Sequence, residues 1–336
     1  MARSRFLWLA VLAVGAALTS SATAIEYTKL LPADTEAVTC INIRQILDSA
    51  LVKSVGLAQA KEALNQALQG NDQINEYVKS LGIDPFTDIN RITVAGPANK
   101  DSDKGVIVIE GKFSPEKFKK TAADVAKNHG DHLKIGKIGS RELWEVTVPQ
   151  QDKTFFVTLA DNQTLVAALS KASLSEALAQ ADGKKVELKK GMREVIDGVD
   201  GKASFYFAAL SDALIQAIQE GLKNADVPNA VKVSDMAKEL RQKLNALSGS
   251  ITLSDDLKFQ VTLSTKEPKT AKEMSQMVTM AQGVGILALN QAAQNNEQLM
   301  PLIEVVQNIR ATTKGSIVII RGGITADAIN RVKRGN

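Results

Sequence analysis

The stretch that decides the fold is residues 91–126, RITVAGPANKDSDKGVIVIEGKFSPEKFKKTAADVA. It holds two apolar runs, one around Ile92 and one from Val106, and a polar turn separates them. Such runs bounded by Gly, Pro, Asn and Asp predict a β-hairpin. Ser114 and Pro115 then predict the start of a helix, because serine caps a helix and proline suits its first position.

The same order of elements recurs at residues 250–281, SITLSDDLKFQVTLSTKEPKTAKEMSQMVTMA, where Pro268 takes the place of the earlier proline. Within it, residues 257–263 alternate between apolar and polar side chains, which predicts a strand with one solvated face. A closing strand and short helix also recur, at residues 165–178 and 317–329. Landmarks that repeat in the same order predict two related halves.

Hairpins joined to helices favour antiparallel sheets, so we expect an α+β fold. Each of its two related halves is predicted to be a mainly antiparallel sheet with helices packed on one face. The expected divisions are a signal peptide at 1–24, a first α+β half at 25–183 and a second α+β half at 184–336. The boundary is the charged connection 184–190. Strands expected at 143–159 have no counterpart in the second half.

The first residues have the pattern of an export signal. Arg3 and Arg5 precede an uncharged apolar run at 6–18, and residues 22–24, Ala-Thr-Ala, form a small-x-small cleavage site. The run is too short to span a bilayer comfortably. We therefore expect cleavage after Ala24, no transmembrane segment in the remaining chain, and a location in the periplasm, at the cell surface or outside the cell.

The composition argues against several kinds of partner. Removing the signal leaves 39 basic against 37 acidic side chains, a balance that does not predict nucleic-acid binding. Aromatic residues make up 4% of the chain, too few to favour a surface on which bases or sugars stack. The single cysteine, Cys40, cannot form an internal disulfide and lies in a strand pattern, so we expect a buried, inert thiol.

The only two histidines enclose an acid, in His129-Gly130-Asp131-His132. Two imidazoles with the carboxylate of Asp131 could ligate a transition metal, with Asp124 one turn back as a further ligand. The competing interpretation is a solvated turn at a helix end, where Gly130 breaks the helix.

No other motif predicts catalysis or a cofactor. The acidic turns at 101–103 and 254–256 lack the spacing of a calcium loop. The glycines at 283–285 and 322–323 lack the lysine of a phosphate loop, and no Gly-x-Ser-x-Gly elbow is present. We therefore predict no cofactor.

The helices expected in the second half include those at 234–247 and at 268–294. The longer helix carries Met274, Met277 and Met280 at three-residue intervals. Methionines can line a groove for an apolar ligand or a partner helix, whereas the simpler interpretation is that they pack on the sheet.

Residues 31–38, LPADTEAV, and the strand that ends in INIR at 41–44 follow the signal. This region resembles the start of uncharacterised exported proteins of planctomycete-type bacteria. The resemblance implies a bacterial, extracytoplasmic setting and supplies no active-site residues.

The sequence therefore favours an exported, non-enzymatic binding or structural protein whose partner is an unknown protein or an apolar small molecule. Two alternatives stay open. One is a periplasmic carrier of an apolar ligand or lipid, with Met274, Met277 and Met280 lining its groove. The other is a metal-dependent hydrolase that uses His129 and His132.

Overall fold

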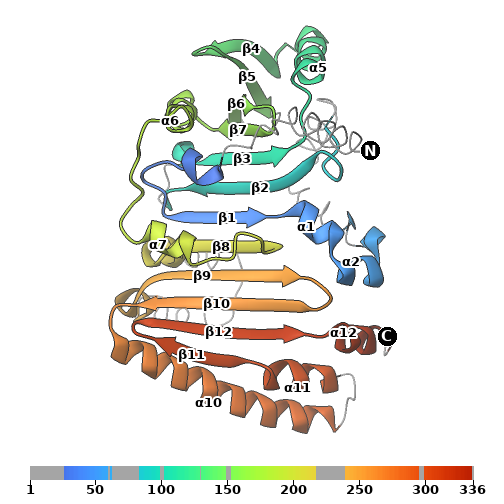
Figure 1. Cartoon of the computed structure of the whole chain (residues 1–336), viewed down its shortest axis with the longest axis vertical. Coiled ribbons are helices and arrows are strands. Elements are labelled where there is room, and N and C mark those ends of the chain that lie inside the picture. The colour runs from blue at the N-terminus through green and yellow to red at the C-terminus, as the bar shows by residue number, and fades with distance from the viewer. Residues whose placement is uncertain are drawn as a thin grey trace, which may run out of the picture.

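The computed structural model describes residues 26–59, 61–62, 83–98, 102–128, 130–148, 153–216, 239–294 and 299–334. The predicted signal peptide, 1–24, lies outside these ranges. The described strands form one antiparallel sheet in the order β11-β12-β10-β9-β8-β1-β2-β3-β7-β6-β5-β4, which Figure 1 shows as a long ladder.

The elements have the following bounds. The strands are β1 (Ala37–Ile41), β2 (Ile89–Gly96), β3 (Val106–Gly111), β4 (Leu133–Ile138), β5 (Arg141–Val148), β6 (Lys153–Asp161), β7 (Thr164–Ala168), β8 (Phe205–Leu210), β9 (Leu244–Leu253), β10 (Leu257–Thr265), β11 (Arg310–Lys314) and β12 (Ile317–Ile324). The helices are α1 (Ile43–Asp48), α2 (Ala50–Val55), α5 (Pro115–Asn128), α6 (Lys171–Ala181), α7 (Met192–Asp197), α10 (Pro268–Ala293), α11 (Met300–Gln307) and α12 (Ala326–Arg334), and η1 (Tyr27–Leu30) and η2 (Ser102–Lys104) are 3-10 turns.

Two halves of the sheet follow the same plan outward from its centre. The order β1-β2-β3-β7-β6 in the first half matches β8-β9-β10-β12-β11 in the second. At the centre β1 pairs antiparallel with β8, with Val38 opposite Ala208, so an approximate two-fold axis passes between these strands. In the first half α5 is followed by β4 and β5, whereas in the second half α10 is followed by α11. The prediction of an α+β fold with two related antiparallel halves is therefore confirmed, and the halves share one sheet.

Helices lie on both faces of this sheet, so the expected packing of helices on one face of each half is wrong, because alternate residues of the strands are apolar on both sides. On the face called here the α6 face, Leu174 of α6 and Met192 of α7 are buried with Val38 and Val106 in one cluster. On the opposite face, called the α10 face, Phe118 of α5 packs with Trp144, their rings 4.5 Å apart at an edge-to-face angle. Further along the α10 face, α10 buries Ala271 and Met274 against Leu244 and Val318. Helices α5, α6, α7 and α10 therefore each cover one section of one face.

The two proline-led helices begin where the sequence predicts, α5 at Pro115 and α10 at Pro268. The helix expected at 234–247 is wrong in its last part, because Leu244–Leu253 is strand β9. Cross-strand pairing with β8 and β10 decides this segment, and it overrides the helical spacing of its leucines. Residues 217–238 lie outside the described ranges.

Cys40 is free and fully buried, as predicted. It lies on the α6 side of β1, in the same cluster as Tyr27 and Tyr206. Burial raises the pKa of its thiol, which keeps the sulfur protonated and unreactive.

Leu174 of α6 is fully buried in the cluster that joins the two halves, whereas Leu57 is 39% exposed. Replacing Leu174 with alanine leaves a cavity, so we expect the free energy of unfolding to fall by about 2–5 kcal/mol. Leu57→Ala is the matched control and should cost about 0.5–1 kcal/mol. Urea unfolding followed by circular dichroism measures both changes. Equal losses for the two variants would contradict the assigned core.

Candidate functional site

The two halves differ most in how the α6 face is covered. In the first half α6 packs over β3, β6 and β7 on this face. Its counterpart α12 packs against α11 instead. Among the residues that the structure describes, no helix takes the position of α6 over β10, β12 and β11. Within the described chain, this part of the sheet therefore has no covering helix in the second half, and Ala246 and Ser248 of β9 are nonetheless buried.

We call this surface the open face, and three rows of cross-strand partners define it. The rows, each running from β9 through β10 and β12 to β11, are Ser250-Gln260-Arg321-Arg310, Ser248-Thr262-Ile319-Thr312 and Ala246-Ser264-Ile317-Lys314. Most members carry a hydroxyl, an amide or a positive charge. The intervening residues, such as Leu263 and Val318, point to the α10 face and pack under α10. The alternation in β10 had predicted this division.

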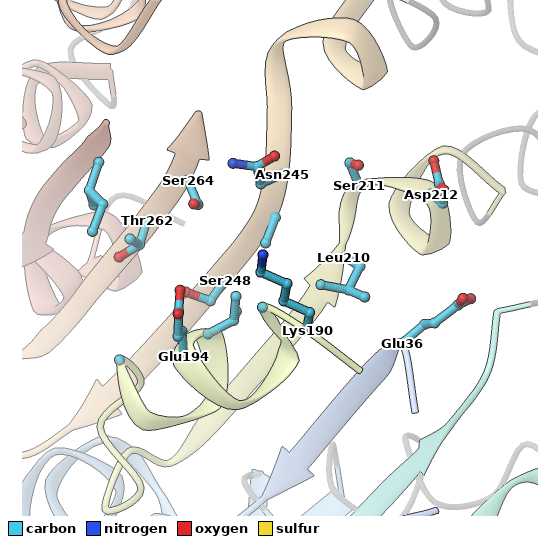
Figure 2. A pocket seen from close by; sticks show the side chains of 15 residues that line it. Glu36, Lys190, Glu194, Leu210, Ser211, Asp212, Asn245, Ser248, Thr262 and Ser264 are labelled. Atoms are coloured by element: carbon cyan, nitrogen blue, oxygen red, sulfur yellow. The ribbon is translucent and has the colours of Figure 1, made fainter. Parts of the chain in front are cut away.

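A hollow of about 570 Å³ lies at one end of the open face, where α7 approaches β9 and β10. In Figure 2, Lys190 and Glu194 lie on the α7 side of the hollow, and Asn245, Ser248, Thr262 and Ser264 lie on the strands. The lining also includes Leu210 and Ile317, so its floor is partly apolar. The hollow thus combines hydroxyl, amide and charged groups, the mixture that orients a polar ligand.

Local sequence explains how α7 frames this hollow. Gly191 adopts a left-handed conformation, with φ of 87°, which turns the chain directly before the helix. Met192 and Ile196 are buried against the sheet, four residues apart on one side of the helix. Glu194 and Val195 line the hollow. A helix of six residues therefore both closes the core and forms one wall of the hollow.

Two carboxylates at the rim of the hollow are held by cations. Glu36 forms an ion pair with Lys189, and its carboxylate also accepts a hydrogen bond of 3.1 Å from the amide of Ala98. Asp212 pairs with Arg241 at 2.7 Å. Burial raises the pKa of Glu36, but the hydrogen bonds from Lys189 and Ala98 outweigh this effect and hold the pKa below its ordinary value of 4.5. The Glu36 carboxylate therefore stays charged and paired near neutral pH.

Lys190 and Glu194, by contrast, form no ion pair or hydrogen bond with another side chain of the described residues. Both are exposed at the hollow. One ammonium and one carboxylate are therefore available to a bound molecule.

A second hollow of about 380 Å³ lies at the other end of the open face, and its lining includes Lys258, Arg310 and Arg321. Arg310 and Arg321 lie directly opposite each other on β11 and β12. Two like charges at such positions destabilise the pairing of the strands. Arg321 donates a 2.8 Å hydrogen bond to the amide oxygen of Gln260, and Arg310 donates to the backbone carbonyl of Ile309 at the same distance. Within the described chain, none of the three cations has a carboxylate partner. This end of the open face is therefore positively charged.

The predicted metal site is only partly described. His129 lies outside the described ranges, and Asp131 and His132 lie in the turn between α5 and β4. Asp124 is exposed on α5. The described residues contain no group of three potential metal ligands. The metal-dependent hydrolase therefore stays a prediction without structural support.

The three methionines of α10 do not line one groove. Met274 is buried under the sheet, whereas Met277 and Met280 are largely exposed. The reason is geometric. Three residues turn about 300° around a helix, so successive methionines are displaced by about 60° from one another. The packing interpretation therefore describes Met274 alone, and the apolar carrier loses the lining assigned to it. Within the described ranges, no helix combines the length and apolar character that a bilayer span requires.

Sequence reasoning did not find the two hollows, because their residues come from segments far apart in the chain. Lys190 precedes α7, Ser248 lies on β9 and Arg310 lies on β11. One signal was available: the polar residues of 257–263 alternate, which marks the wet side of β10. Which residues of neighbouring strands share that side follows from the sheet order, which alternation does not give.

Comparisons with known proteins add a similarity of layout. No protein-family model matches the chain, and no curated protein sequence does. Among solved structures, the chain is similar to TP0453 in its crystal forms I, III and IV. The sequence identities are 11%, 9% and 10% and the TM-scores 0.46, 0.45 and 0.47. The similar region covers 93%, 92% and 94% of this chain and 98%, 97% and 99% of TP0453.

Replacing Glu36 with glutamine tests the electrostatics at the rim of the hollow. Because the folded-state pKa of Glu36 is lowered, its contribution to stability is present above the ordinary pKa of 4.5 and is lost as pH falls through the folded value. We expect Glu36→Gln to lower the free energy of unfolding at pH 7 by about 0.5–1 kcal/mol.

The difference from the wild type should shrink as the pH is lowered below 4.5. Urea unfolding at a series of pH values measures it. The control is Glu187→Gln, an exposed position on the connection 184–190 that also carries Lys189. A deficit that persists unchanged into acid would contradict the assigned role of the Glu36 carboxylate.

Proposed function

We propose that this protein is an exported, non-enzymatic binding protein that holds a polar, negatively charged ligand on its open face. The observation that carries the proposal is the difference between the halves. The strands that α6 covers in the first half have counterparts in the second that stay uncovered within the described chain, and these are hollowed at both ends.

The polar character of the ligand follows from the rows of the open face. Hydroxyl groups of Ser248, Thr262 and Ser264 line the larger hollow, and the amide of Asn245 lies beside them. Such groups both donate and accept hydrogen bonds. A ligand that lacked polar groups would leave them without partners, at a cost in affinity.

The negative charge follows from the cations. Lys258, Arg310 and Arg321 at one end and Lys190 at the other have no carboxylate partner in the described chain. The lining carboxylates without a cation partner there are fewer, namely Glu194 and Asp256, and Asp256 accepts a hydrogen bond from the backbone amide of Ala326. Arg310 and Arg321, which are cross-strand neighbours, lie well within the screening length of about 10 Å and act together at moderate ionic strength. An elongated anion that reaches both hollows would satisfy most of these groups.

Binding without catalysis is proposed because of how the carboxylates are held. A general base works best with a pKa near the operating pH. The pKa of Glu36 is lowered, which moves it away from neutral pH, and Asp212 forms an ion pair with Arg241. The extracytoplasmic setting rests on the signal predicted at 1–24 and on the resemblance to exported planctomycete-type proteins.

A ligand search can be made by thermal shift with pairs of molecules that differ only in charge. Suitable pairs are dicarboxylates, sugar phosphates and acidic peptides, each with its neutral analogue. We expect anionic members to raise the melting temperature and the neutral ones to have little effect. Stabilisation should weaken as salt is added, since salt screens exposed charges. A preference for the neutral members would count against the proposal.

Thr262 and Thr313 provide a matched pair for locating the ligand. Thr262 lines the larger hollow, and Thr313 is exposed on β11, pointing to the α10 face. Thr262→Phe fills the hollow, so we expect affinity for an anion found in the search to fall at least about tenfold, roughly 1.4 kcal/mol. Thr313→Phe should leave affinity unchanged. Calorimetric titration measures both, and equal affinities would place the ligand elsewhere.

A further inference from the structure

The outward side of α10 carries an apolar stripe that no described part of the chain covers. Met277, Met280, Val284 and Leu287 are 48%, 63%, 67% and 72% exposed. They recur at intervals of three and four residues, so they share one side of the helix. An adjoining side of the helix packs on the sheet through Ala271 and Met274. The helix α10 is therefore apolar both where it packs on the sheet and along the exposed stripe.

The composition of α10 supports the same conclusion. Residues 274–294 contain no charged side chain, which leaves the middle and end of α10 without the lysines and glutamates that normally solvate an exposed helix. Helix α11 packs against α10, where Gln282 donates a 2.8 Å hydrogen bond to the carbonyl of Val306, and leaves the stripe exposed.

The apolar area of this stripe is about half of what one partner buries in a specific interface. If a full side chain of this size offers about 150–200 Å², near the low end for aromatic side chains, the four residues of the stripe expose on the order of 400 Å². A standard interface buries about 800 Å² on each partner, part of which is a polar rim. Gln276 and Gln291 are exposed on the same helix and could supply that rim.

We propose that a second copy of this chain covers the stripe, with two α10 helices packed antiparallel across a two-fold axis. A surface of this kind meets itself in an isologous dimer, since each copy offers the same patch. The absence of charge from 274 to 294 means that no like charges meet when the helices pair. Figure 1 shows α10 at one end of the long axis of the molecule, so a partner there is clear of the first half.

A second copy fits these observations better than a lipid surface. Helices that lie on membranes carry lysine and arginine beside their apolar side, where these contact anionic headgroups. On α10 the only cations, Lys269 and Lys272, precede the uncharged run. Protein interfaces, in contrast, are depleted of charge at their centre and enriched in methionine.

Matched charge substitutions on neighbouring residues test this proposal. Met280 lies on the stripe, and Thr279 is exposed beside it but turned by about 100° around the helix. Analytical ultracentrifugation of the full chain over a range of concentrations should show a dimer for the wild type and for Thr279→Glu. Met280→Glu should be monomeric, with a dissociation constant raised at least about tenfold.

Cysteine cross-linking supplies an independent measurement of the arrangement. The native Cys40 is buried and should stay silent. Met280→Cys and Val284→Cys lie near the middle of the stripe, where an antiparallel pair brings the two copies together, so a mixture of the two variants should oxidise to a covalent dimer. Thr279→Cys is the control and should not cross-link.

Several outcomes would overturn the proposal. These are a wild type that is monomeric at all concentrations, a dimer that Met280→Glu leaves intact, and cross-linking that is no faster at the stripe than at Thr279. Sedimentation with vesicles of phosphatidylcholine and phosphatidylglycerol distinguishes the lipid alternative. Binding of a monomeric wild type that Met280→Glu abolishes would assign the stripe to a membrane surface and reject the second copy.

Discussion

The pairing of β1 with β8 is the contact on which the rest of the structure depends. Five residue pairs join these strands, and the side chains on their α6 side enter a cluster drawn from both halves. Without this pairing each half would expose a strand edge at its centre, and Leu30 and Met192 would lose their shared environment. Two tyrosines, Tyr27 and Tyr206, are also buried in this central cluster. Tyr206 is buried beside Cys40, and burial raises the pKa of both groups, so both remain neutral.

The two halves share one plan of strands, and the surfaces with unpaired charges and polar groups lie where the halves differ. In the first half, α6 folds back over the sheet, anchored where Arg141 forms two hydrogen bonds with the carboxylate of Asp182. In the second half, α12 extends past the end of β12 to meet α11, where Arg331 pairs with Glu304. The closing helix covers the α6 face in the first half, where it is α6. It leaves this face uncovered in the second half, where it is α12. The same exchange, in which α11 takes the place of β4 and β5, brings α10 to the outer end of the molecule.

The sequence predicts those elements whose local signals agree with their final packing. The hairpin at 91–126 and the proline-led helices are of this kind, because strand period, turn residues and caps all indicate the same structure. The elements that are missed have weak local signals. Strand β11, RATTK, has one apolar residue, and α7 buries only Met192 and Ile196. The start of β9 was misassigned because leucines at helical spacing can also serve a strand when β8 and β10 pair with it.

The candidate site was less predictable than the fold, for a different reason. Methionines at three-residue intervals suggest a shared groove in the sequence. In the helix, however, Met274 is buried in the core and Met280 is exposed to solvent. The groups that line the hollows, such as Lys190 and Thr262, are ordinary surface residues in sequence. Only the order of strands in the sheet brings them together.

A sheet of this length has just two edges in the described chain, β4 and β11, and the composition of both bears on solubility. Exposed Lys134 and Lys137 lie on β4, and exposed Arg310 and Lys314 lie on β11. Unpaired edge strands are templates for aggregation, and positive side chains on them repel a second sheet that would add to the ladder. The molecule can therefore extend its sheet to twelve strands and still resist growth into a fibril.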